Sequence, residues 1–332
     1  MTTFKEIQGR NIRAVSTDPA NPGEGEMWYN KTIGVLKGYV SLGGSWSSGG
    51  NLNTARAYGG SSGTPTAAVY FGGAPLTTPT TSSATENYDG STWTTSGALS
   101  TGRSEFGGTG TQTAGLAVAG NTPGGGGPGL NLTNAVEEYN GSSWTAGGNY
   151  PVSIRQNAAF GVQTAAVSFG GNPAGSSVTT TNEYNGSTWT GSGALITSLR
   201  YVSGAGIESA GVALLGYSDG IPGIYATAQN YNGSSWTTGG TLNNSRFNGA
   251  ASGSSSSDVF ALGGGTSNNA ELYDGTSFTA ATSFTTARTA SGATGITPTA
   301  NTLIFGGDTP TSTAATEEYT DPTFGTQTLT TS

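Results

Sequence analysis

The sequence has no cysteine and no histidine among its 332 residues, and only 9% of its residues are charged. Without cysteine there is no disulfide, no thiolate metal site and no thiol nucleophile. Without histidine the commonest general base and metal ligand is missing, which excludes Ser-His-Asp hydrolysis and His-ligated zinc or copper. We therefore expect no catalytic residues, no cofactor and no metal, and we interpret the protein as a non-enzyme.

Basic residues and long apolar segments are scarce as well. The chain has 11 Lys and Arg against 19 Asp and Glu, and no lysine follows Lys37. This balance disfavours nucleic-acid binding, which needs clustered positive charge. No stretch reaches the roughly 18 apolar residues of a membrane helix, and Met1 to Arg10 lack the pattern of a signal peptide. We expect neither nucleic-acid binding nor membrane insertion. We also expect that the protein is made in a cytoplasm.

What is abundant is glycine, with 57 residues beside 13 prolines. That composition fits either a disordered polar chain or a repeat protein of short strands and many turns. Internal repetition decides for the repeat protein. One hexapeptide, Tyr-Asn/Asp-Gly-Ser/Thr-Ser/Thr-Trp/Phe, recurs at 88–93, 139–144, 184–189, 231–236 and 273–278, with a worn copy at 319–324.

An arginine follows each repeat aromatic by ten or eleven residues, starting with Trp46 and Arg56. Successive arginines lie 42 to 52 residues apart, the length of a propeller blade. The six are Arg56, Arg103, Arg155, Arg200, Arg246 and Arg288. Their equivalence favours a structural ion pair with Glu86, Glu137, Glu271 or Glu317, each two residues before a repeat tyrosine. A functional alternative is a ring of arginines that binds an anion in a central channel.

Each repeat is predicted to form four strands. The first follows the arginine and is rich in glycine, which suits an innermost strand in a crowded centre. The second is a short apolar run ending in glycine, such as 67–73, as expected for a strand covered on both faces. The third ends at the tyrosine and the fourth begins near the tryptophan, joined by Asn-Gly or Asp-Gly in a predicted type I′ hairpin turn.

The double glycine after an apolar strand, the tyrosine, the tryptophan and the following arginine together resemble the kelch repeat. The resemblance covers about residues 51–332 and implies an all-β, six-bladed kelch-like β-propeller. Departures are the short Tyr-to-Trp turn, the degenerate glycine pairs near Gly120 and Gly216, and phenylalanine for tryptophan at Phe278 and Phe324.

The first fifty residues have a different composition, so we predict two domains, 1–44 and 45–332. Glu26–Asn30 and Gly34–Val40 read as the two strands of a small β-hairpin around Lys31 to Ile33. Three short stretches, 9–13, 18–19 and 25–30, together resemble N-terminal segments of structural proteins from marine tailed bacteriophages. That resemblance implies a virion component whose residues 1–44 attach to other virion proteins or to further copies of the chain.

The sequence pattern of the fourth strand occurs once more than six complete repeats need. The additional copy lies around Trp46. Its spacing to Arg56 places it just before the first repeat, where it can complete the last blade and close the ring. Phe324 would then be displaced outward or form an extra edge strand. The alternative is a seventh blade built from the three N-terminal strands.

Recognition residues are expected on the connections between second and third strands, which vary most between repeats. Their low charge suits a neutral polysaccharide or a protein surface. The candidate binding residues are Thr77, Asn121, Asn131, Asn172, Asp219 and Tyr225. Carboxylates such as Glu105, Glu208, Asp219 and Asp258 fall in different repeats, so nothing in the sequence pairs two of them for glycoside hydrolysis.

The sequence thus predicts a non-enzymatic virion structural protein of a tailed phage, a tail-fibre or appendage component that serves host attachment. It would be assembled in the host bacterial cytoplasm. Alternatives are a capsid decoration or fibre protein, and an adhesin that binds host-surface polysaccharide.

Overall fold

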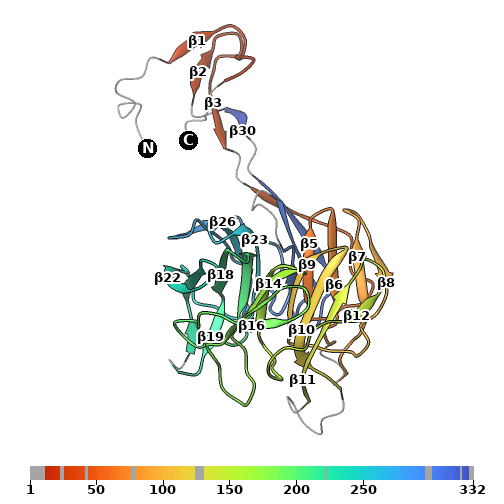
Figure 1. Ribbon diagram of the computed structural model, residues 1–332. Helices are drawn as coiled ribbons and strands as arrows, with labels where there is room; N and C mark the ends of the chain where they lie inside the picture. The colour runs from red at the N-terminus through yellow and green to blue at the C-terminus, as the bar shows by residue number, and fades with distance from the viewer. Residues whose placement is uncertain are drawn as a thin grey trace. The chain divides into compact units, whose positions relative to one another are not determined.

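The computed structural model describes residues 12–22, 26–41, 44–75, 80–123, 131–220, 223–295, 301–321 and 324–328. The chain divides into two compact units: unit 1 comprises Met1–Ser45 with Asp321–Ser332, and unit 2 comprises Trp46–Thr320. All regular elements in the described part of the chain are β-strands (Figure 1). The all-β prediction is therefore confirmed. Within those same residues no helix is long and apolar enough to cross a membrane.

Unit 2 contains four-stranded sheets that repeat along the chain, six of them in its described residues. We number these sheets 1 to 6 in chain order. Sheet 1 consists of β5 (Gly60–Thr64), β6 (Ala67–Phe71), β7 (Thr85–Tyr88) and β8 (Trp93–Ser96). Sheet 2 consists of β9 (Gly107–Thr111), β10 (Ala114–Asn121), β11 (Leu132–Tyr139) and β12 (Trp144–Ala146). Sheet 3 consists of β13 (Ala158–Val162), β14 (Ala165–Phe169), β15 (Thr181–Tyr184) and β16 (Trp189–Gly191).

The remaining three sheets follow the same order. Sheet 4 consists of β17 (Ser203–Ile207), β18 (Ala210–Leu214), β21 (Thr227–Tyr231) and β22 (Trp236–Thr241), and its β18–β21 connection forms a separate hairpin of β19 (Gly216–Ser218) and β20 (Gly223–Tyr225). Sheet 5 consists of β23 (Ala250–Ser255), β24 (Asp258–Leu262), β25 (Ala270–Tyr273) and β26 (Phe278–Ala281). Sheet 6 consists of β27 (Gly292–Ala293), β28 (Asn301–Phe305), β29 (Thr316–Thr320) and β4 (Ser45–Ser48).

The fourth strand of sheet 6 comes from the opposite end of the repeats. As the spacing around Trp46 predicts, β4 lies beside β29. Trp46 packs against Tyr319, with ring centroids 5.2 Å apart, and its indole N–H donates to the carbonyl of Thr282 at 2.7 Å. The backbone N–H of Gly49 donates to the carbonyl of Thr316 at 2.9 Å. Strand β4 therefore connects the first repeat to the last.

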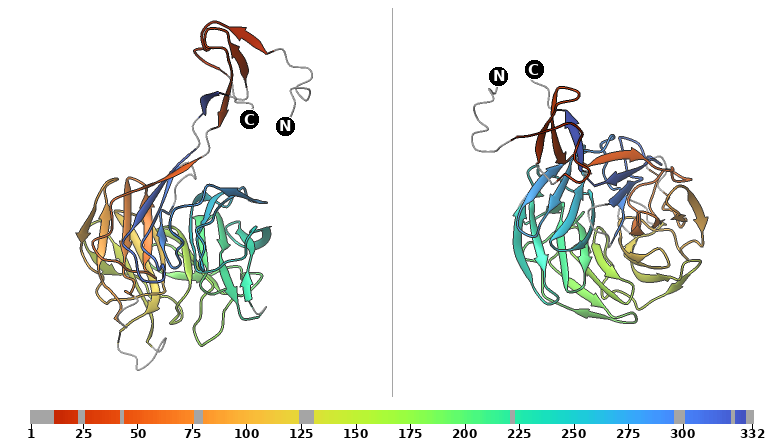
Figure 2. Two further views of the ribbon diagram at one scale, coloured as in Figure 1. Left: turned by 180° about the vertical axis from the view of Figure 1, so that it is seen from behind. Right: turned by 90° about the horizontal axis from the view of Figure 1, so that it is seen from above.

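The first strands of the sheets lie against one another around a common centre, as the view from above indicates (Figure 2). Contacts run from β5 to β9, β13, β17, β23 and β27 in turn, and β27 also contacts β5. Glycine is needed here because there is no room for a side chain: a Cβ on Gly108 would lie 2.5 Å from the Cα of Gly60. This arrangement is compatible with a propeller-like fold.

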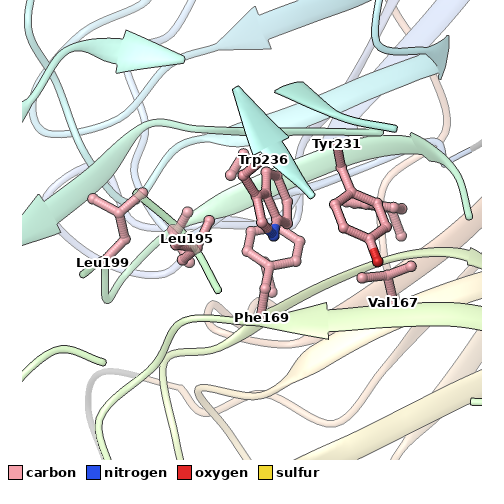
Figure 3. Packing of buried hydrophobic residues seen from close by; sticks show 10 residues of the cluster. Val167, Phe169, Leu195, Leu199, Tyr231 and Trp236 are labelled. Atoms are coloured by element: carbon pink, nitrogen blue, oxygen red, sulfur yellow. The ribbon is translucent and has the colours of Figure 1, made fainter. Parts of the chain in front are cut away.

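Apolar side chains fill the space between neighbouring sheets. Between sheets 3 and 4, Val167 and Phe169 of β14 face Tyr231 and Trp236 (Figure 3). The rings of Phe169 and Trp236 are 5.1 Å apart. The second strands are buried on both faces, as their continuous apolar runs predict. Burying one such side chain stabilises the fold by about 1.5–3 kcal/mol.

The repeat tyrosines connect each sheet to the one before it. The hydroxyl of Tyr184 in sheet 3 donates to Glu138 of sheet 2 at 2.6 Å. The hydroxyl of Tyr88 in sheet 1 donates in the same way to Glu318 of sheet 6. Tryptophan indoles make parallel contacts, namely Trp144 with Thr85, Trp236 with Thr181 and Trp93 with Thr316. Sheet 1 therefore binds sheet 6 through the contacts that join consecutive sheets.

The hairpin between third and fourth strands differs from the predicted type I′ turn. Tyr184 pairs with Trp189, which leaves a loop of four residues. Only its glycine, Gly186, has a positive φ, at 88°. The side-chain oxygen of Asn185 accepts the backbone N–H groups of Ser187 and Thr188 at 3.0 and 2.9 Å. The type I′ prediction is wrong because the Asn side chain, rather than a left-handed Asn backbone, closes the turn.

Unit 1 is built on one four-stranded sheet in the order β1 (Arg13–Val15), β2 (Met27–Asn30), β3 (Val35–Ser41) and β30 (Phe324–Thr328). The predicted hairpin is present as β2 and β3, which pair antiparallel. Strand β1 adds to β2 in parallel, and β30 adds to β3 antiparallel. The predicted boundary counted 321–332 with the repeats, whereas these residues belong to unit 1. The Phe324 strand is thus an edge strand of the N-terminal sheet.

One buried tryptophan and one carboxylate organise the N-terminal sheet. Trp28 is fully buried, and its indole donates to Asp18 at 2.9 Å. Asp18 also accepts a hydrogen bond from Asn30 at 2.8 Å and forms an ion pair with Lys37. The hydrogen bond from Lys37, followed by those from Trp28 and Asn30, lowers the pKa of Asp18 to about 2. Asp18 therefore ties the segment before β2 to both strands of the hairpin.

Candidate functional site

The predicted loop residues of sheet 2, Asn121 and Asn131, make hydrogen bonds within their own repeat. The backbone N–H and carbonyl of Asn121 pair with Ser104, both at 2.9 Å. The side chain of Asn131 donates to the carbonyl of Pro123 at 3.0 Å, and its carbonyl accepts from Thr122. Thr77 lies outside the described residues. The Asn121 backbone and the Asn131 side chain therefore hold the base of the connection in shape.

The other three candidates lie on the connections of sheets 3 and 4. Asn172 is buried, and its side-chain oxygen accepts the backbone N–H of Gly175 at 2.6 Å. Asp219 accepts the backbone N–H of Ser177 at 2.8 Å, which joins the two connections. The hydroxyl of Tyr225 accepts a hydrogen bond from Thr197 at 3.2 Å, and its ring packs on the core between sheets 3 and 4. The five candidates that the structure describes thus do not form one cluster.

Four of the repeat arginines form the predicted buried ion pairs. The pairs are Arg56 with Glu86, Arg103 with Glu137, Arg246 with Glu271 and Arg288 with Glu317. All eight side chains are at most 5% exposed. Burial lowers the pKa of Arg103 and Arg288, which the paired carboxylates oppose. These arginines are inside the sheets and unavailable to a ligand.

Arg155 and Arg200 do not match the prediction that all six arginines are equivalent. Each follows its aromatic by eleven residues rather than ten, so Ile154 and Leu199 occupy the buried position instead. The matching carboxylates are absent too, since the residues two before the repeat tyrosines are Asn182 and Gln229. A buried arginine and its carboxylate have been replaced together by neutral residues, which avoids an unpaired buried charge.

The two displaced arginines find new partners near the surface of unit 2. Arg155 pairs with Glu105 at 2.9 Å. Arg200 binds both oxygens of Asp219, at 2.8 and 3.0 Å, and its guanidinium lies 4.7 Å from the centre of the Tyr217 ring. The hydrogen bond from Arg200 lowers the pKa of Asp219. The predicted ring of anion-binding arginines is therefore absent from the described residues.

A different ring of six residues lies at the start of the inner strands. Each follows its repeat aromatic by twelve residues and has a positive φ between 48° and 60°. The six are Tyr58, Glu105, Gln156, Tyr201, Asn248 and Ala290. We call them the inner ring. Their backbones are hydrogen-bonded in succession: Tyr58 to Glu105 to Gln156, and Tyr201 to Asn248 to Ala290 and back to Tyr58.

The inner ring is informative because its side chains vary while its backbone does not. A left-handed backbone favours glycine or asparagine, and other residues are strained there by about 1–2 kcal/mol. Five of the six positions nevertheless carry polar side chains, four of them larger than asparagine. A requirement of the sheets themselves would give the same residue in each repeat. The variation therefore marks the inner ring as the candidate functional site.

The inner ring borders a central cavity of about 130 Å³. The cavity is lined by the inner ring and by the first strands of the sheets, which contribute mainly glycine, alanine and serine. Tyr58, Glu105, Tyr201 and Asn248 are each partly exposed, so solvent reaches the cavity at the inner ring. The structure thus provides a small, open and polar site in unit 2.

The electrostatics of the site are close to neutral. Glu105 is the one carboxylate among the described lining residues, and Arg155 neutralises it. Burial, then the charges of Asp308, Tyr201 and Glu105, raises the pKa of Tyr58 to about 12. Burial and Glu105 also raise the pKa of Tyr201. Both hydroxyls therefore stay protonated at neutral pH and can donate hydrogen bonds.

Three buried polar atoms of the lining have no hydrogen-bond partner among the described residues: the side-chain oxygens of Gln156, Asn157 and Ser291. Gln156 is 3% and Asn157 4% exposed. The amide nitrogen of Gln156 donates to Glu105 at 3.0 Å, and that of Asn157 to Ser168 at 3.0 Å and to the carbonyl of Val118. These acceptors fix the orientation of both amides, so each carbonyl oxygen is left unpaired. An unpaired buried acceptor costs about 1–3 kcal/mol.

In the described residues no cluster of three or more acidic side chains could hold a metal ion. Among the described residues that line the cavity, Glu105 has no second carboxylate beside it, and glycoside hydrolysis by a pair of acids needs two. No protein-family model matches the chain, and no curated protein is significantly similar to it. The site is therefore interpreted from its geometry: it can bind a small uncharged ligand through hydrogen bonds.

The sequence interpretation missed the inner ring because no single residue type is shared by its six positions. A usable signal was present nonetheless. Counting from each repeat aromatic, position twelve varies between repeats and is polar in five of the six. The eleven-residue spacing to Arg155 and Arg200, together with Asn182 and Gln229, also identified the two repeats that lack the buried ion pair.

Proposed function

We propose that the protein is a non-enzymatic structural component of a tailed-phage virion, with the six sheets of unit 2 forming a closed, six-bladed kelch-like propeller. In this proposal unit 1 attaches the chain to the particle and unit 2 is displayed. The observation that carries it is the division of the chain: both ends combine in one small sheet, and the repeats form the other unit.

Ring closure is supported by contacts that recur between the first and last sheets. Tyr88 and Trp93 of sheet 1 bind Glu318 and Thr316 of sheet 6 as their counterparts bind the preceding sheet. The inner-ring hydrogen bond from Tyr58 to Ala290 joins the same two sheets. A closed ring leaves no unpartnered sheet face, which explains how a chain with 33% hydrophobic residues can fold.

The attachment role rests on the resemblance of residues 9–30 to the N-terminal segments of marine phage structural proteins. Unit 1 supports this role because it exposes apolar side chains: Tyr29 of β2 is 41% exposed, and Ile33 in the turn between β2 and β3 is 57% exposed. Such residues on a small unit suit contact with another virion protein or another copy of the chain. The proposed location is a tail fibre or appendage, with a capsid decoration as the alternative.

A reconstruction of the intact phage particle, with an antibody against unit 2 as a marker, tests this proposal. We expect the marker on the tail or its fibres. Label on the capsid would favour the decoration protein instead. Absence of the chain from purified particles, checked by mass spectrometry, would contradict a virion role altogether.

A second candidate function is binding of host-surface polysaccharide, and the central cavity favours it. Its near-neutral charge and its unpaired hydrogen-bond acceptors suit sugar hydroxyls. A glycan array probed with the full chain would test this function independently of the position on the particle. Binding of defined glycans would support an adhesin, and a blank array would leave only the structural role.

A further inference from the structure

We infer that the central cavity of unit 2 is a binding site for a small, uncharged, hydroxyl-bearing ligand, either a short polyol or the edge of one sugar residue. This inference concerns the cavity alone and does not depend on a virion location. It rests on the unpaired acceptors, the volume and the charge of the lining.

The unpaired oxygens of the lining residues match a ligand that donates hydrogen bonds. The side-chain oxygens of Gln156 and Asn157 can only accept, because they are amide carbonyls whose orientation is fixed by Glu105, Ser168 and Val118. The hydroxyl of Ser291 can both donate and accept. A ligand hydroxyl matches all three, since it also donates and accepts.

The charge of the lining disfavours ions. Arg155 neutralises Glu105, so a cationic ligand would lose its hydration without meeting a free negative charge. An anion such as phosphate would face the carbonyl oxygens of Gln156 and Asn157, which repel it. Neutral hydroxyl groups incur neither cost.

The volume sets the size of the ligand. A cavity of about 130 Å³ is slightly smaller than the roughly 150 Å³ that accommodates benzene in an engineered protein. A group of about six non-hydrogen atoms therefore fits, which corresponds to glycerol or to one edge of a pyranose ring. A larger glycan would place its remaining residues outside the inner ring, where Tyr58 and Tyr201 are partly exposed.

The backbone of the inner ring supports a binding role for its side chains. Gln156 has a φ of 60°, where glycine would be less strained. A side chain kept at the expense of backbone strain is typical of binding positions. Replacing it with glycine should therefore preserve or raise the stability while removing one acceptor.

Two substitutions and one control test the inference. Gln156→Gly removes an acceptor, and Ser291→Ala removes the unpaired hydroxyl with almost no change in size. The control is Ala119→Gly, which relieves a φ of 62° at a position outside the cavity lining. Melting temperatures establish that each variant folds before binding is compared.

Binding to the full chain is measured by saturation-transfer NMR and calorimetry with glycerol, glucose and galactose, and with tetramethylammonium and inorganic phosphate as charged comparators. A glycan array separates a free polyol from a glycan end as the source of the hydroxyls. We expect a neutral compound to bind, each cavity substitution to weaken it roughly tenfold, and Ala119→Gly to have no effect. Failure of all neutral compounds, preference for a charged comparator, or unchanged affinity in both folded cavity variants would overturn the inference.

Discussion

Arg56 and Glu86 form an ion pair whose side chains are 0% and 2% exposed, inside sheet 1. The same pair recurs in sheets 2, 5 and 6, but in sheet 4 its two places are taken by Leu199 and Gln229. Gln229 still accepts the backbone N–H of Ile196 at 2.7 Å, as Glu86 accepts that of Asn53. The repeat thus has a charged and a neutral form of one buried interaction.

The neutral form should rescue a broken ion pair. Arg103→Leu leaves Glu137 buried without its partner, and we expect a loss of about 3–5 kcal/mol in the free energy of unfolding. Arg103→Leu combined with Glu137→Gln copies sheet 4 and should recover most of that loss. Urea denaturation of the two single variants and the double variant measures the coupling. Additive losses would contradict the equivalence of the two forms.

The hairpin turns should depend on one side-chain oxygen. Asn185→Ala removes the acceptor for the N–H groups of Ser187 and Thr188, and we expect a loss of about 1 kcal/mol in unfolding free energy. Asn185→Asp is the matched control, because Asp89 and Asp274 make the same hydrogen bonds in their own turns. It should be nearly neutral at pH 7. Equal losses in both variants would mean that the oxygen is not what closes the turn.

Closure of the ring should make Trp46 as important as the tryptophans inside the repeats. Its ring packs on Phe260, Phe284 and Tyr319, so Trp46→Ala should lower the unfolding free energy of unit 2 by about 2–4 kcal/mol. Tyr29→Ala, in the sheet of unit 1, should leave that transition unchanged. Thermal unfolding, monitored by circular dichroism, compares the Trp46 and Tyr29 variants with the parent. A Trp46 variant as stable as the parent would argue against closure by β4.

Stability should fall at alkaline pH. Burial, then the neighbouring carboxylates, raises the pKa of Tyr88, Tyr184 and Tyr231 to about 12, above the usual value of 10.0. The folded state therefore keeps protons that the unfolded chain releases from pH 10 upward. The stabilisation is complete below pH 10 and is lost progressively as the pH rises to 12.

Melting temperatures between pH 8 and pH 11 measure this effect. The triple variant Tyr88→Phe, Tyr184→Phe and Tyr231→Phe should be less stable at pH 8 and show a shallower decline above pH 10. Tyr29→Phe, at an exposed position, serves as the control and should follow the parent curve. If the melting temperature of the parent protein fell with pH as shallowly as that of the triple variant, the three tyrosines would not be the cause of the alkaline loss of stability.

The periodic features of the fold could be predicted from the sequence. The apolar runs, the Tyr-to-Trp hairpins and the surplus strand at Trp46 each follow from spacing, and the strands lie where these patterns predict. The turn type could not be predicted because Asn-Gly suits both a two-residue type I′ turn and a longer loop that the Asn185 side chain closes. An edge strand at Phe324 was one of two predicted outcomes, but its partner could not be predicted because β3 lies outside the repeats.

The candidate site was harder to predict than the fold. The loop residues such as Asp219 are variable, but their side chains shape the connections themselves. The inner ring depends on convergence of six distant residues at one centre, which the spacing of a single repeat does not reveal. Only the register relative to each aromatic places Gln156 beside Glu105.

The most direct measurement of the central claim, that the first and last repeats are joined in a closed ring, is a set of nuclear Overhauser contacts from the indole of Trp46. The closed six-sheet arrangement predicts contacts with Tyr319, whose ring centre is 5.2 Å away, and with Phe284 at 5.6 Å. Contacts from Trp46 to β2 and β3 instead, with none to Tyr319 or Phe284, would contradict closure and favour a seventh sheet built from the N-terminal strands.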